Sequence, residues 1–139
     1  MSNATMKNEA DAILNWYKGS AYTGAPTTLY AALLTANPTK NDGTGLVECS
    51  DSAYARQPIT CSTGWSAVSQ SGDNIHDQIS NAAAITFPNC AGAGYTVVGL
   101  AIYDAVTAGN LKRAQSVTSQ AVSTGNGYQI AIGGLVIEI

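Results

Sequence analysis

Two short, strongly apolar segments constrain the fold of this chain most. Residues 28–35 read TLYAALLT, a nearly continuous apolar run, and residues 95–103 read YTVVGLAIY. Apolar runs of this length are typical of β-strands that are buried on both faces. The sequence therefore predicts a sheet with cover on both sides, in which the first segment is a central strand and the second is a buried strand.

Several weaker segments also have the character of strands, and turns rich in Gly, Pro and Asn separate them. Pro58 confines one of them to a sheet edge or ends it, while Gly133 and Gly134 indicate a bulge or a close backbone approach in the last. The polar residues 69–80 predict a loop. The weaker strands are expected at residues 54–59, 64–68, 82–87, 111–122 and 128–139. Roughly seven or eight short strands in this pattern predict an all-β fold, a single β-sandwich of jelly-roll-like or Ig-like type.

One helix is predicted near the N-terminus. Thr5 is expected to be its N-cap and Gly19 its C-terminal stop. Trp16, near the end of this helix, is expected to anchor it together with the tyrosine that follows, either in the domain's own core or on a neighbouring subunit. We therefore divide the chain into an N-terminal helical arm over residues 1–19 and a β-sandwich domain over residues 20–139. The apolar residues that recur at helical spacing are Met6, Ala10, Ile13, Leu14 and Tyr17.

Charged residues make up only 11% of the chain, whereas a typical soluble domain has about 25%. The outer surface is therefore either a sheet face of Ser and Thr or a surface covered by neighbouring subunits, since interface centres lose charge and keep Tyr and Trp. The net charge of −3, with only six Lys and Arg residues, argues against nucleic-acid binding. Because the N-terminal residues contain no uninterrupted apolar stretch, we expect no signal peptide, and because no run of about 18 apolar residues is present, we expect no membrane segment.

Few residues are candidates for catalysis or metal binding. His76, the only histidine, lies between Asp73 and Asp77 in a polar stretch, and we interpret the three as a solvated loop tip. The three cysteines are an odd number without Cys-x-x-Cys spacing, which argues against zinc. A disulfide between Cys49 and Cys61 stays open beside the alternative of buried free thiols. We therefore expect no catalytic, cofactor or metal site and no enzymatic activity.

Contacts between subunits are the remaining kind of site. Arg56 stands in an otherwise uncharged strand, so we expect a buried or interfacial guanidinium that backbone carbonyls or a carboxylate satisfy. Large apolar and aromatic residues are the other candidates, because interface centres are enriched in them. The residues expected at an interface are Ile13, Leu14, Trp16, Tyr17, Arg56 and Trp65.

Several sequence blocks occur in an order that resembles a known family. After a helix that ends in Trp-Tyr come GSAYT (19–23), PTTLYAALLTANP (26–38), YARQ (54–57), NAAAITFP (81–88), VGLAIYDA (98–105) and GNL (109–111). Together they resemble small virion proteins of tailed phages that are often labelled tail-fibre-like and whose relatives include capsid cement or decoration subunits. Residues 61–79 depart from the pattern, and a phage-specific contact is expected there. The family brings no catalytic residues.

The resemblance implies a structural protein of a bacteriophage virion, assembled in the host cytoplasm. The first hypothesis is a capsid cement subunit that binds the major capsid protein and copies of itself, as a homo-oligomer that is trimeric or associated with hexamers. The alternative is a tail-fibre or tail-tip component, in which Trp65, Tyr95 or Tyr54 stacks on host glycans. A lytic or depolymerising enzyme is a third class, which the thin supply of acid and base groups disfavours.

Overall fold

One large antiparallel sheet dominates the computed structural model, which describes residues 3–22 and 24–139. Its strands are β1 (Asn3–Thr5), β2 (Thr28–Ala36), β3 (Val47–Glu48), β4 (Gln57–Thr60), β8 (Tyr95–Tyr103) and β9 (Leu111–Val122). They follow the order β1-β9-β8-β2-β3, and β4 also pairs with β2. Because β2 pairs with β8 along one side and with β3 and β4 along the other, the prediction of a central strand at residues 28–35 is confirmed.

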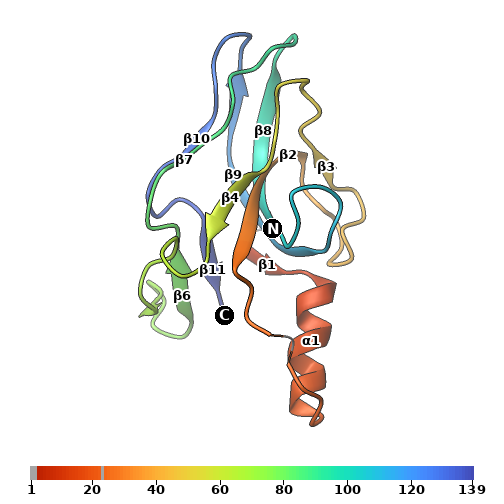
Figure 1. Ribbon diagram of the computed structural model, residues 1–139, viewed down its shortest axis with the longest axis vertical. Coiled ribbons are helices and arrows are strands. Elements are labelled where there is room, and N and C mark those ends of the chain that lie inside the picture. The colour runs from red at the N-terminus through yellow and green to blue at the C-terminus, as the bar shows by residue number, and fades with distance from the viewer. Residues whose placement is uncertain (1–2, 23) are drawn as a thin grey trace.

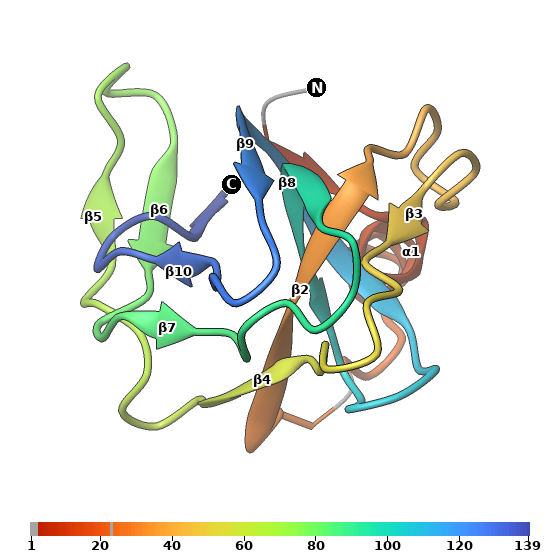
Figure 2. The ribbon, with the colours of Figure 1, turned by 90° about the horizontal axis from the view of Figure 1, so that it is seen from above.

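Two small sheets form a second layer over one face of this main sheet. They consist of β5 (Ser69–Gln70), β6 (Asp77–Ser80) and β11 (Val136–Glu138) in one, and β7 (Ile85–Thr86) and β10 (Gln129–Ile130) in the other. Figure 2 shows them on one side of the main sheet, and helix α1 (Lys7–Tyr17) together with β3 toward the other side. The fold is therefore an all-β sandwich with one N-terminal helix, as the sequence predicts.

The two faces of the main sheet carry separate cores, because successive side chains of a strand point to opposite faces. In β2, Ala31 and Leu33 face the second layer, whereas Ala32 and Leu34 face away from it, and all four are fully buried. The smaller core on the far face is closed by Met6, which is only 1% exposed. The second layer and its connections contribute Ile85, Phe87, Tyr128, Ile130 and Leu135 to the larger core.

Gly99 interrupts the apolar run of β8 for a steric reason. A Cβ atom at this position would overlap the side-chain oxygen of Asn37 and would lie 3.0 Å from the carbonyl oxygen of Gln115. The Asn37 amide donates to the carbonyl oxygen of Val98 at 3.1 Å and to Ser116 Oγ at 3.3 Å. Asn37 therefore ties the end of β2 to β8 and β9, and only glycine leaves room for it.

Helix α1 begins one residue later than the sequence predicts. Its N-cap is Met6 and not Thr5, because Thr5 is still extended and pairs with Arg113 of β9. The Thr5 hydroxyl accepts a hydrogen bond from Arg113 Nη1 at 2.6 Å instead of capping the helix. At the other end, Gly19 has a φ of +88° and its N–H donates to Trp16 O at 2.9 Å. The predicted helix stop is thus confirmed.

The segment before α1 belongs to the main sheet, because β1 pairs with β9 at its edge. The division into residues 1–19 and 20–139 stays a prediction, and residues 1 and 2 lie outside the described part of the chain. Among the described residues, no helix is long and apolar enough to cross a membrane.

Two sequence predictions near residue 69 are wrong. Residues 64–68 form no strand in the structure, apart from an isolated bridge between Trp65 and Asn81, and the loop expected over residues 69–80 contains β5 and β6. The cause is tertiary, since β6 pairs along its length with β11 at the other end of the chain. A polar segment becomes a strand there because the apolar C-terminal strand is its partner.

Three other predicted strands are shorter than expected. The one expected at residues 54–59 begins only at Gln57, as β4. Of residues 82–87, only two form β7, and residues 128–139 divide into β10 and β11. Gly133 has a φ of +79°, and the N–H of Gly134 donates to Ala131 O at 2.9 Å. The two glycines therefore mark a turn that carries the chain from one small sheet to the other.

The three cysteines are free thiols, so no disulfide joins Cys49 to Cys61. Cys49 and Cys90 are buried in the larger core, and Cys61 is half-buried. Burial raises the pKa of the Cys49 thiol. The two buried cysteines therefore act as small apolar side chains of the core.

Candidate functional site

The C-terminal half of α1 presents apolar side chains to solvent. We call Ile13, Leu14, Trp16 and Tyr17 the α1 patch. Leu14, Trp16 and Tyr17 are 61%, 55% and 75% exposed, and Ile13 is half-buried. The rings of Trp16 and Tyr17 meet edge to face with their centroids 5.0 Å apart. Figure 1 shows α1 projecting beyond the end of the main sheet, so the patch lies away from the sandwich.

The first turn of α1, by contrast, is fixed to the sandwich. The Lys7 N–H donates to Asn41 O at 2.7 Å, and the preceding Met6 is buried in the smaller core. Glu9 forms an ion pair with the buried Arg113 of β9, with 2.7 Å between Oε2 and Nε. The helix itself has no buried residue. Its fixed start and exposed end favour a contact with another molecule over a role in the domain's own core.

Arg56 lies in a buried polar network at the edge of the main sheet. Its Nε and Nη2 donate to the two carboxylate oxygens of Glu48, each at 2.8 Å. Its Nη1 donates to the carbonyl oxygens of Ala105 and Ala108 at 2.8 and 2.7 Å. The guanidinium also lies 3.5 Å from the centroid of the Tyr103 ring. The expectation of a guanidinium satisfied by carbonyls and a carboxylate is therefore confirmed.

The electrostatics of this network favour the ionised pair. Burial alone would raise the pKa of Glu48, but hydrogen bonds from Arg56 and Tyr54 and the charge of Arg56 outweigh it, so the pKa of Glu48 lies below its usual value. Through its bonds to Ala105 and Ala108, Arg56 also fixes the turn over residues 104–110. Val106 of this turn is 52% exposed. Arg56 thus positions this turn from inside the domain, while its role in an interface stays a prediction.

The aromatic residues proposed to stack on glycans all pack against the larger core. Trp65, Tyr54 and Tyr95 are half-buried there. The Tyr54 ring stacks on Phe87 with centroids 6.1 Å apart, and its hydroxyl donates to Glu48 at 2.7 Å. Tyr54 therefore already has partners for its ring and its hydroxyl. The interface role of Trp65 stays a prediction.

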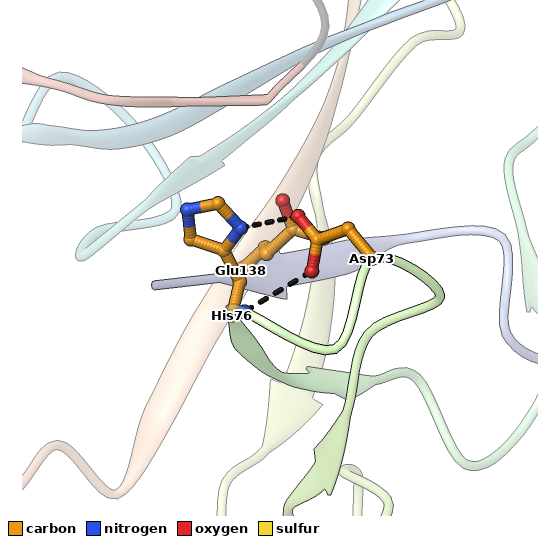
Figure 3. Close-up of side chains that lie close together, drawn as sticks. All are labelled: Asp73, His76 and Glu138. Atoms are coloured by element: carbon orange, nitrogen blue, oxygen red, sulfur yellow. Dashed lines mark hydrogen bonds and ion pairs between the residues drawn. The ribbon is translucent and has the colours of Figure 1, made fainter.

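The loop with the only histidine brings three side chains together. Asp73 and His76 lie between β5 and β6, and Glu138 reaches them from β11 (Figure 3). Their candidate ligand atoms all lie within 4.8 Å of one another. His76 Nδ1 is 2.5 Å from Asp73 Oδ2, and this hydrogen bond, with the charges of Asp73 and Glu138, raises the pKa of His76.

Sequence reasoning missed Glu138 and placed Asp77 beside the histidine instead. Asp77 begins β6, and its backbone exchanges two hydrogen bonds of 2.9 Å with Ile139. It does not belong to the cluster formed by the three side chains. Glu138 reaches the loop only because β11 pairs with β6, and no spacing in the sequence indicates that pairing.

A comparison with known families shows what kind of protein carries these features. A family model described as podophage GP4 fiber I protein gp80 matches residues 3–138, which is nearly the whole chain. The chain belongs to this phage fibre family. No curated protein matches the chain.

Membership of the fiber I protein gp80 family makes the chain a structural component of a bacteriophage virion. The resemblance to tail-fibre-like virion proteins is thereby confirmed. The family description supports a fibre role and leaves a role as capsid cement unconfirmed.

Proposed function

We propose that this chain is a building block of a podophage fibre that acts without catalysis, and that copies of it associate through the α1 patch. The observation that carries the proposal is the exposure of Leu14, Trp16 and Tyr17 at the free end of α1 in a member of a fibre family. The absence of catalysis rests on the thin supply of acid and base groups in the sequence.

The α1 patch has the composition of an interface centre. Aromatic residues are enriched in such centres, charged residues are depleted, and Trp and Tyr are frequent among the residues that dominate binding. None of the four patch residues carries a charge. At the other end of the helix, Lys7 and Asp11 form an ion pair of 2.8 Å with each other. Most of the binding free energy would therefore come from the burial of apolar and aromatic surface.

A second copy of the chain is the partner that fits this surface best. Identical uncharged patches of a homo-oligomer meet around a symmetry axis without charge repulsion. The charge-poor composition of the chain, with only 11% charged residues, fits a subunit whose surface is partly covered by its neighbours. A trimer or an assembly associated with hexamers is the form of homo-oligomer that capsid or tail symmetry favours.

A capsid cement subunit is the second candidate. In that role the same patch would bind the major capsid protein, and the charge-poor surface would be covered by capsid subunits. The low charge favours either role equally, whereas the family description favours a fibre. The fibre is therefore our first proposal.

Immunogold labelling of intact virions tests the location. We expect an antibody against this chain to label fibres and to leave the head surface clear, while an antibody against the major capsid protein labels the head in the same preparation. Gold particles spread evenly over the head would contradict the fibre role and favour cement.

A further inference from the structure

We propose that Asp73, His76 and Glu138 form a surface site for a divalent transition-metal ion of the zinc class. Their ligand atoms are one imidazole nitrogen and two carboxylate oxygens, all within 4.8 Å of one another (Figure 3). Zn²⁺ binds this donor set in proteins, and three protein ligands leave a fourth position open. Ca²⁺ and Mg²⁺ prefer oxygen ligands alone, so the imidazole favours zinc.

The loop that carries two of the ligands is held by its own hydrogen bonds. Asp73 Oδ1 accepts from the N–H groups of Ile75 and His76 at 2.9 and 3.1 Å, and from Ser71 Oγ at 2.5 Å. The Ser71 N–H in turn donates to His76 O at 2.8 Å. One oxygen of the Asp73 carboxylate is thereby fixed, and the other faces the imidazole. Such a preorganised pair loses little conformational freedom when it binds an ion.

Glu138 approaches from a distant part of the sequence and supplies the third ligand of the cluster. It lies opposite Gln78 in the pairing of β11 with β6, and its carbonyl oxygen accepts from Arg113 Nη1 at 3.1 Å. Its backbone is therefore fixed. Its carboxylate has no hydrogen bond or ion pair with any residue in the described part of the chain. A carboxylate without a hydrogen bond of its own is thus held beside the Asp73 and His76 pair, where a cation would bind to all three.

The three side chains must shift slightly to admit the ion. Bonds of about 2.0–2.2 Å to zinc place two ligands of a tetrahedral ion roughly 3.4 Å apart, whereas His76 Nδ1 and Asp73 Oδ2 are 2.5 Å apart. The His76 ring must therefore move away from Asp73 by roughly 1 Å. The side chains of His76 and Asp73 are 47% and 45% exposed, so an ion has access from solvent.

A bound ion would cross-link the β5–β6 loop to the C-terminal strand β11. These elements form the small sheet β11-β6-β5, and connecting segments join it to the rest of the second layer. Because a ligand that binds only the folded state stabilises that state, zinc should raise the melting temperature of the chain.

The test is a titration of the full chain with ZnCl₂ by isothermal titration calorimetry, after removal of any affinity tag and treatment with a chelator. We expect one equivalent of zinc to bind, and the affinity to fall at least about tenfold in His76→Ala and in Glu138→Gln. Asp77→Asn is the matched control, because it removes a carboxylate adjacent to His76 that lies outside the cluster. It should bind zinc as the unmodified chain does.

Two results would overturn the proposal: no binding to the unmodified chain, or unchanged binding to Glu138→Gln. His76→Ala also removes a hydrogen bond within the loop, so its folding is checked by thermal melting without zinc. The Glu138 carboxylate has no such bond, and Glu138→Gln therefore keeps the test decisive even if His76→Ala does not fold. Loss of the zinc-dependent rise in melting temperature in Glu138→Gln, with that rise retained in Asp77→Asn, would support the site.

Discussion

Replacing Arg56 with methionine is expected to lower the free energy of unfolding by about 3–5 kcal/mol. The substitution leaves Glu48, whose side chain is only 23% exposed, without its charged partner. It also removes the hydrogen bonds to the carbonyl oxygens of Ala105 and Ala108, and the cation on the face of Tyr103. Chemical denaturation followed by tryptophan fluorescence measures the change.

Lys7→Met is the matched control for this substitution. Lys7 and Asp11 form an ion pair of the same 2.8 Å length, but their side chains are 58% and 52% exposed, so its loss should lower the free energy of unfolding far less than the loss of Arg56 does. Adding Glu48→Gln to Arg56→Met should recover part of the lost stability, because it removes the uncompensated charge. If Arg56→Met lowered the free energy of unfolding no more than Lys7→Met does, the structural role of the network would be refuted.

Loss of the Arg56–Glu48 ion pair should also change how the free energy of unfolding depends on pH. The pKa of Glu48 in the folded chain lies below its usual 4.5, so its stabilising effect is complete above that value and is lost as the pH falls through the folded-state pKa. Without Arg56, burial disfavours the ionised Glu48, and protonation at low pH relieves that penalty. The difference in stability between the two proteins should therefore narrow as the pH falls toward 4.5, and it should narrow further below that pH.

Substituting serine for Trp16 and Tyr17 together is expected to abolish self-association of the purified chain. Central aromatic residues of an interface contribute about 2 kcal/mol or more each, so the double substitution should weaken association by about 1,000-fold. The subunit itself should stay folded, because α1 has no buried residue. Sedimentation velocity at several concentrations measures the association, and thermal melting reports on folding.

Val68→Ser is the control for a general effect of removing apolar surface. Val68 is 73% exposed and directly precedes β5, which lies on the opposite side of the molecule from α1 (Figure 2). This variant should associate as the unmodified chain does. A monomeric unmodified chain, or a double variant that still associates, would refute the role proposed for the α1 patch.

The parts of the fold that were predictable are those in which the chain's own apolar pattern determines the structure. The runs at residues 28–35 and 95–103 became β2 and β8 because both of their faces are buried. The strand β6 was not predictable, since its residues are polar and its partner β11 lies at the far end of the chain. Short strands of this kind depend on tertiary pairing more than on their own composition.

The candidate sites also divide into those that the sequence reveals and those that depend on strand pairing. Arg56, which directly precedes β4, was predictable because a lone cation in an otherwise uncharged stretch needs acceptors nearby. The apolar character of the helix was also visible in the sequence. Its placement was not, because the pairing of β1 with β9 and the burial of Met6 fix the start of the helix and leave Trp16 and Tyr17 in solvent. Glu138 joins the histidine loop through strand pairing alone, which sequence spacing does not reveal.

The copy number of this chain in purified virions tests the central proposal most directly. Quantitative mass spectrometry with isotope-labelled peptides gives its ratio to the major capsid protein in the same particles. A fibre subunit predicts far fewer copies than the major capsid protein. A copy number close to that of the major capsid protein would contradict the fibre role and place the chain on the head.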